Sequence, residues 1–155
     1  ILLKITFFLI FLVTSSCTYE PIFKEKNYNF EIGEINLIGE KDTNRIIKNK
    51  LNLIKEDKNT FKKKYDISIN TKKYREIISK NSQGDPLKFE LNLNVNYKIE
   101  ENKKLLINRE INKKYIYNNV SDKFKLEQDE KIILENLSEE VSDIIISSII
   151  NLNDY

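Results

Sequence analysis

The run Leu87–Ile99, LKFELNLNVNYKI, alternates between apolar and polar residues over its whole length. Successive side chains of a β-strand point to opposite faces, so this spacing predicts a strand with one buried face and one hydrated face. Such a strand is typical of an antiparallel sheet that is covered on one side only. The hydrated face is predicted to carry Lys88, Glu90, Asn92, Asn94, Asn96 and Lys98.

Three further strands are predicted around this one. The turn signal NSQGDP at Asn81–Pro86 precedes it, and the polar stretch Glu100–Lys104 turns the chain into the other arm of a hairpin. In the first predicted strand the apolar phase changes near Gly33, as a β-bulge requires. The three strands are expected at Asn29–Ile38, Tyr65–Ile78 and Leu105–Tyr117.

Two segments have helical periodicity. Asp42–Thr43 supplies N-cap chemistry for a helix over about Asn44–Glu56. From about Leu126, apolar residues recur at three- and four-residue steps over roughly 25 residues, and acidic residues occupy the expected first turn. The order β-α-β-β-β-α predicts an α+β, two-layer sandwich with two helices packed on one face of a four-stranded, mostly antiparallel sheet. A helix between the first two strands is compatible with a parallel crossover.

The composition limits the chemistry that the chain can perform. Its 155 residues suggest one domain, and 26 basic residues nearly balance 24 acidic ones, which argues against a nucleic-acid-binding protein. Histidine is absent and Cys17 is the only cysteine. Metal sites that need His or paired Cys, His-based catalytic triads and a disulfide core are therefore excluded. We expect no metal, no cofactor and no enzymatic activity.

The beginning of the chain has the order of a secretory signal. Lys4 precedes the apolar run Ile5–Val13, and the small residues Ser15–Ser16 follow. The run is about half the roughly 20 residues that a membrane-spanning helix needs. Cys17 comes next, as in a bacterial lipobox, although Thr14 stands where that motif usually has Leu. An ordinary signal peptide with an incidental cysteine, or a buried strand, are the alternative interpretations.

The lipobox interpretation divides the chain into three parts. Residues 1–16 are predicted to be a lipoprotein signal peptide, residues 17–28 a lipid-anchored tether and residues 29–155 the folded domain. Cys17 would carry acyl chains such as palmitate, and two or more chains give stable membrane attachment. Thr18, in place of Asp, follows the cysteine. By analogy with lipoprotein sorting, this favours the periplasmic side of the outer membrane.

Clusters of basic residues next to aromatic ones are candidates for binding an anionic lipid headgroup. One cluster follows Phe61 and another surrounds Tyr74, while Lys113–Lys114 lies beside Tyr115. The alternative is a solvated, lysine-rich surface. The candidate binding residues are Lys62, Lys63, Lys72, Lys73 and Arg75.

The chain resembles the LPS-assembly lipoprotein family, LptE, in its alphaproteobacterial form. The stretch Cys17–Phe23, CTYEPIF, looks like the family's Cys-Gly-aromatic-x-Pro-Leu-aromatic opening, with Thr18 in place of Gly. A second match runs from Asn96–Tyr97 through Arg109, Tyr115–Tyr117 and Asn119–Ser121 into the last helix. The expected element order also agrees with the family's two helices on a four-stranded sheet.

The resemblance implies a non-enzymatic, lipidated outer-membrane protein. Such a protein would plug the LptD-type outer-membrane β-barrel protein, support its assembly and help to insert lipopolysaccharide into the outer leaflet. Cys17 is the one functional residue that carries over. A stand-alone periplasmic lipoprotein that binds a lipid or a peptide is the alternative, and a secreted enzyme of unknown class is a distant third. Nucleic acid is not an expected partner.

Overall fold

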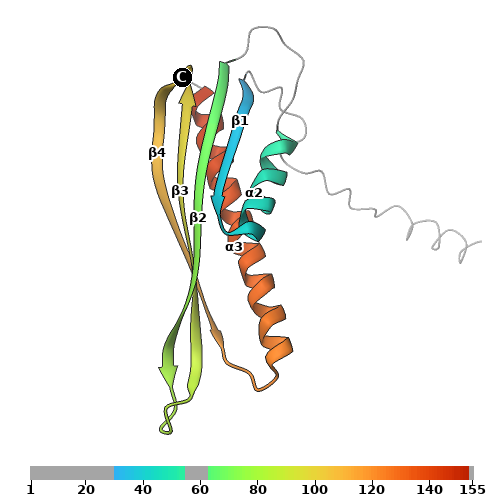
Figure 1. The fold of residues 1–155 in the computed structure, drawn as a ribbon, viewed down its shortest axis with the longest axis vertical. Helices are drawn as coiled ribbons and strands as arrows, with labels where there is room; N and C mark the ends of the chain where they lie inside the picture. Colours follow the sequence, from blue (N-terminus) through green and yellow to red (C-terminus); the bar gives the residue numbers. More distant parts are fainter. Residues whose placement is uncertain (1–29, 55–62, 154–155) are drawn as a thin grey trace, which may run out of the picture.

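The computed structural model describes residues 30–54 and 63–153, which form one sheet and two helices. Figure 1 shows both helices on the same face of the sheet, with the long last helix running beside the strands. The elements in chain order are β1 (Phe30–Gly39), α2 (Lys41–Leu53), β2 (Lys63–Lys80), β3 (Pro86–Glu101), β4 (Lys104–Asn118) and α3 (Lys123–Asn153). The predicted α+β fold and element order are confirmed. Residues 1–29, on which the predicted signal peptide and tether fall, lie outside the described part.

The sheet has the strand order β1-β2-β3-β4. β1 pairs with β2 in parallel, and the other two pairings are antiparallel. The alternating run that predicted β3 is central, and its apolar residues lie under the helices. Its buried side chains are Phe89, Leu91, Leu93, Val95, Tyr97 and Ile99. The parallel crossover and the mostly antiparallel sheet are therefore as predicted.

The predicted bulge in β1 is present. The pairing register with β2 shifts between Ile32 and Ile35, and Gly33 lies within the shift. The backbone N–H of Glu34 donates to Oδ1 of Asp66 at 2.9 Å. The carboxylate therefore satisfies a backbone donor at the irregularity, in the same place where the apolar phase of the sequence changes.

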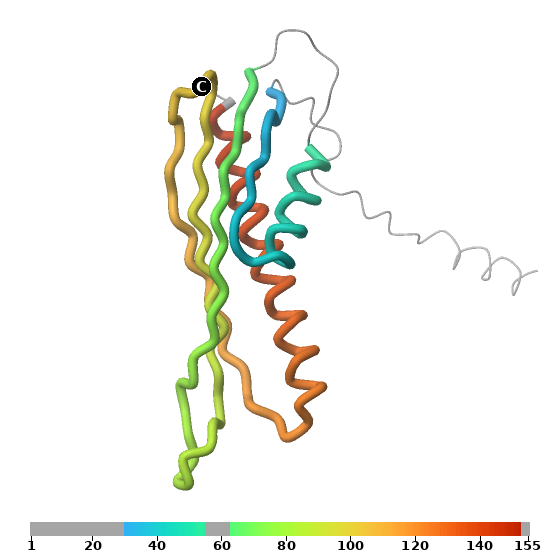
Figure 2. The backbone as a smooth tube through the Cα atoms, viewed as in Figure 1, coloured from blue at the N-terminus to red at the C-terminus, as the bar shows by residue number. Residues whose placement is uncertain are grey.

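β1 ends where the buried Thr71 bonds to the turn before α2. Thr71 Oγ1 accepts from the N–H of Glu40 at 2.8 Å and donates to Oδ1 of Asn44 at 3.0 Å. Gly39, at φ +104°, makes the turn. Because β1 stops opposite Thr71, the rest of β2 has no strand on that side in the described part of the chain. In Figure 2, β1 and α2 lie beside only one half of the length of β2.

Both helices begin earlier than the sequence predicted. Glu40 is the N-cap of α2, and its Oε2 accepts from the N–H of Thr43 at 2.6 Å. The expected caps, Asp42 and Thr43, lie inside the helix, and Thr43 is buried against α3. Asp122 accepts from the first backbone N–H groups of α3, so the acidic residues after Leu126 are not in its first turn.

The open face of the sheet differs from the prediction at one residue. Asn92 was expected to be hydrated, yet its side chain is only 2% exposed. It lies directly between Tyr74 on β2 and Lys114 on β4 in the cross-strand register. These two long side chains flank the shorter amide, which accounts for its burial. Its Oδ1 has no hydrogen-bond partner among the described residues.

Candidate functional site

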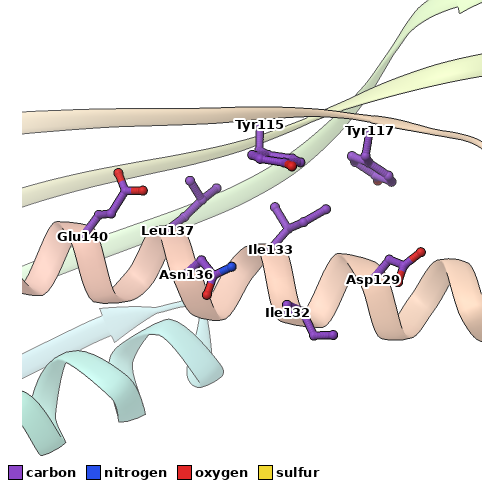
Figure 3. Close-up of a pocket in the computed structure, with 8 residues that line it drawn as sticks. All are labelled: Tyr115, Tyr117, Asp129, Ile132, Ile133, Asn136, Leu137 and Glu140. Atoms are coloured by element: carbon purple, nitrogen blue, oxygen red, sulfur yellow. The ribbon is translucent and has the colours of Figure 1, made fainter. Parts of the chain in front are cut away.

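A groove of about 380 Å³ lies between β4 and α3. Figure 3 shows Tyr115 and Tyr117 extending from β4 toward the helix, and Ile133 and Leu137 pointing back toward the strand. The middle of the groove is therefore apolar, and carboxylates stand toward its two ends. It is lined by Tyr115, Tyr117, Asp129, Ile132, Ile133, Asn136, Leu137 and Glu140.

One wall of the groove is held in place by three charged or polar side chains. Glu130 Oε1 on α3 accepts from Tyr117 Oη at 2.6 Å and from Arg75 Nη1 at 2.5 Å. The Arg75 guanidinium also lies over the ring of Phe89, 4.6 Å from its centroid, and that ring packs on Tyr117. We call Arg75, Tyr117 and Glu130 the sheet–helix tie. It connects two strands to the first half of α3.

The tie changes the protonation behaviour of Tyr117. Burial is the largest cause that raises the pKa of its phenol, and the hydrogen bond to the Glu130 carboxylate raises it further. The same carboxylate raises the pKa of Arg75, chiefly through their hydrogen bond. Tyr117 therefore stays neutral and Arg75 charged over the whole physiological pH range. Neither Tyr117 nor Arg75 is therefore poised to exchange a proton near neutral pH.

Tyr117→Phe is expected to lower the free energy of unfolding by about 1–2 kcal/mol at pH 7, because it removes one hydrogen bond to a carboxylate. The folded state keeps the Tyr117 proton at a pH where the unfolded chain, with a pKa of about 10, releases it. The stabilisation is thus complete below about pH 10 and decreases above it. Urea unfolding of both proteins at pH 7, 9 and 11 measures this. A difference that grows with pH would contradict it.

A second hollow, of about 480 Å³, lies on the β2 side of the tie. Lys73 and Leu91 contribute from the sheet, Asp42 from α2 and the remaining residues from α3. Both acidic and basic side chains line it, so its walls carry mixed charge. The α3 residues that line it are Phe124, Glu127, Gln128, Glu130, Lys131 and Leu134.

The structure keeps the two predicted basic clusters apart and divides the second between the two faces of the sheet. Lys63 begins β2, and Lys72 follows nine positions later, roughly 30 Å away along the extended chain. Lys72 points to the open face, whereas Lys73 and Arg75 point to the helix face. Lys73 lies 3.9 Å from the Glu40 carboxylate, and Arg75 belongs to the tie. The other two candidate site residues, Lys62 and Cys17, lie outside the described residues.

The open face of the sheet is a polar surface whose side chains bond to one another. Asn94 donates to Glu110, Asn96 donates to Asn94 at 3.3 Å, and Lys114 donates to Glu90 at 3.2 Å. Neither α2 nor α3 covers this face (Figure 1). Its residues alternate in sequence with the buried ones, so the alternation did predict this surface, Asn92 excepted.

Neither the tie nor the groove was predictable from the sequence. Glu130 was expected in the first turn of a helix as a partner of the helix dipole. The structure instead pairs it with β2 and β4 residues 55 and 13 positions away. No local pattern marks such a contact, although the adjacent basic and aromatic residues around Arg75 did draw attention to that strand.

Residues 30–54 and 63–153 contain neither a metal-binding cluster nor a membrane-spanning helix. No group of three or more Cys, Asp or Glu side chains there is arranged to hold a metal ion. None of the helices in that part of the chain is both long and apolar enough to cross a membrane.

Comparison with solved structures identifies the fold. The rare lipoprotein B of Shewanella oneidensis is similar with a TM-score of 0.60 and 14% identity, over 77% of this chain and 96% of its own. Lipoprotein B of Nitrosomonas europaea is similar with a TM-score of 0.60 and 16% identity, over 85% of this chain and 92% of its own. A minor lipoprotein of Acinetobacter baumannii is similar with a TM-score of 0.54 and 15% identity, over 83% of this chain and 95% of its own. No family model matches the chain, and no curated protein does.

Proposed function

We propose that this protein is a lipid-anchored outer-membrane subunit of LptE type, without enzymatic activity of its own. It occupies the lumen of an LptD-type β-barrel protein, supports the assembly of that barrel and assists the insertion of lipopolysaccharide into the outer leaflet. The likeness to three proteins named as lipoproteins carries the proposal, because it spans more than nine-tenths of each of their chains. The lipobox-like Cys17 and the motif that follows it point the same way.

The open face of the sheet suits such a location. The interior of an outer-membrane barrel is polar, and polar side chains that project from a rigid sheet can exchange water for hydrogen bonds to it. Asn70, Asn96 and Asn112 lie on this face and are exposed. The charges on it are mixed in sign, so docking would depend on hydrogen bonds more than on net charge.

Within this proposal, Lys72 is the one of the described candidate residues Lys63, Lys72, Lys73 and Arg75 that is best placed to meet an anionic headgroup. It is exposed on the open face and makes no ion pair within the described ranges. Lys73 and Arg75 are held by Glu40 and Glu130 and would have to leave these carboxylates first. Lys63 stands apart at the start of β2.

Affinity capture from detergent-solubilised outer membranes tests the proposal. The tagged protein is expected to recover a large β-barrel protein in equimolar amount, and its depletion is expected to leave that barrel misassembled. Asn96→Arg, on the open face, should reduce recovery several-fold. Asn52→Arg, which makes the same change on an exposed position of α2, should not. Recovery without a barrel, or equal losses in both variants, would contradict the proposal.

The anchor has a separate test. Growth with labelled palmitate is expected to label the protein, and Cys17→Ala is expected to abolish the label. Labelling that persists in the variant would show that the anchor assignment is wrong. The barrel interaction, which rests on the folded domain, is expected to survive this substitution in solubilised membranes.

The groove between β4 and α3 favours one second candidate function. Its apolar middle and its volume of about 380 Å³ suit part of an acyl chain or a short peptide. A stand-alone periplasmic lipoprotein that binds a lipid or peptide would use this groove. Tyr115→Ser, at an exposed residue that extends into the groove, would then reduce binding of a fluorescent fatty acid without changing recovery of a barrel.

A further inference from the structure

The outer edge of β4 is unpaired in the part of the chain that the structure describes. β4 is the terminal strand of the sheet, and within the described ranges no strand or helix hydrogen-bonds to its outer side. The bond from Asn119 N–H to Leu87 O shows that odd-numbered positions at this end direct their backbone toward β3. The backbone N–H and C=O groups of successive residues point to opposite sides of a strand. The N–H and C=O groups of the even-numbered positions therefore point outward, away from β3. The outward residues are Asn108, Glu110, Asn112, Lys114 and Ile116.

The charges along this edge suit one self-pairing register. If two copies of β4 pair antiparallel about Asn112, Glu110 of each copy lies opposite Lys114 of the other. The same register sets Arg109 opposite the ring of Tyr115, and it places no like charges directly opposite one another. Opposite charges at facing positions stabilise a strand pair, whereas like charges destabilise it.

The neighbouring registers all bring like charges together. Centring the pair on Glu110 or on Lys114 places that residue opposite its own copy. Centring it on Ile111 sets Arg109 opposite Lys113, and centring it on Lys113 sets two lysines face to face. The sequence of β4 thus favours the Asn112-centred pairing over each alternative nearby.

The groove beside β4 also favours a second copy of this chain as the partner of that edge. A two-fold axis through Asn112, perpendicular to the sheet, puts both α3 helices on one face, so the groove of each copy opens toward the other strand. Tyr115 and Ile132 are more than half exposed in the single chain. Arg109 and Asp129 have no hydrogen-bond or ion-pair partner within residues 30–54 and 63–153. Arg109 of a second copy would lie opposite Tyr115, at the acidic rim of the groove.

We propose that the free protein forms a two-fold dimer by antiparallel pairing of β4 with β4 of a second copy, centred on Asn112. The pairing joins the two four-stranded sheets into one and covers the only edge that runs the length of the sheet within the described part. An uncovered edge of this length favours unwanted strand pairing. The inference does not depend on the barrel interaction, because it concerns the purified protein alone.

Disulfide trapping tests the register in the full chain carrying Cys17→Ala, so that each added cysteine is the sole thiol. Facing residues of a hydrogen-bonded antiparallel pair have Cα atoms about 5.5 Å apart, which a disulfide can span. Asn112→Cys is expected to oxidise to a covalent dimer in high yield. Asn108→Cys is the matched control on the same edge, and its own copy would lie roughly 26 Å away. Equal trapping of both variants would overturn the register.

Charge exchange tests the pairing without a thiol. Sedimentation equilibrium should show the unmodified protein as a dimer at tens of micromolar. Glu110→Lys and Lys114→Glu should each raise the dissociation constant by about tenfold or more, because each makes both facing pairs like-charged. An equimolar mixture of the two variants should dimerise again, as should the double variant. A monomer at all concentrations, or a mixture that stays monomeric, would overturn the proposal in favour of a strand from another protein.

Discussion

Gly39→Ala is expected to lower the free energy of unfolding by about 3 kcal/mol or more, out of the roughly 5–15 kcal/mol typical of a domain. Gly39 has φ +104°, and an added Cβ would lie 1.9 Å from the backbone oxygen of Thr71. A positive φ costs an alanine about 1–2 kcal/mol, and the clash with a backbone atom must be relieved by moving the end of β1. That movement would also break the bonds from Thr71 to Glu40.

Gly84→Ala is the matched control for this prediction. Gly84 has φ +91°, yet an added Cβ would meet no atom within 4 Å. The variant therefore measures the cost of the backbone conformation alone, about 1 kcal/mol. Urea unfolding of both variants separates conformation from clash. Equal losses would mean that β1 adapts at Gly39, and that the junction with α2 is less constrained than the structure indicates.

Ser138→Leu is expected to lower the free energy of unfolding by about 3 kcal/mol. Ser138 is fully buried, and its Oγ lies 3.0 Å from Thr43 Oγ1, a hydroxyl–hydroxyl hydrogen bond where α2 meets α3. A leucine there must displace close-packed neighbours, at about 1–3 kcal/mol. It also removes the partner of a buried hydroxyl, which costs about 1–3 kcal/mol more.

Ser147→Leu provides the control on the same helix. Ser147 is exposed, and its Oγ donates to the carbonyl four residues earlier, as Ser138 does. The two substitutions remove the same local bond and differ in what surrounds it. We expect Ser147→Leu to change stability by less than about 0.5 kcal/mol. Comparable losses in both variants would show that the helix, and not its contact with α2, governs the effect.

The strands were predictable because each carries its own signal. The alternation of apolar and polar residues through Leu93 and Val95 indicates which face of β3 is buried. The change of apolar phase at Gly33 indicates the bulge in β1. The turn between β3 and β4 is also local, with Asn102 and Lys103 both at positive φ. These features depend on residues a few positions apart, so the sequence alone determines them.

The helix starts were less predictable because side chains from distant strands decide them. Glu40 caps α2 while its backbone N–H bonds to Thr71, 31 residues later. A local search for caps finds Asp42, which has better intrinsic capping propensity. Strand pairing overrides that preference, since it fixes where β1 ends.

At the candidate site, the types of side chain were predictable from the sequence, but their positions in space were not. It indicated that Arg75 and Tyr117 lie near charged or aromatic residues in the chain. Only the pairing of β2, β3 and β4 brings the two residues to Glu130 and leaves a groove beside them. The same pairing separates Lys63 from Lys72 and directs Lys72 and Lys73 to opposite faces.

The sequence by itself determined the order of the elements, the buried face of each strand and the absence of His- or Cys-pair chemistry. These follow from local periodicity and composition. The tertiary structure decided the tie, the burial of Asn92, the helix starts and the unpaired edge of β4. Each depends on which strands lie side by side and in what register, and that is set by packing the whole core at once.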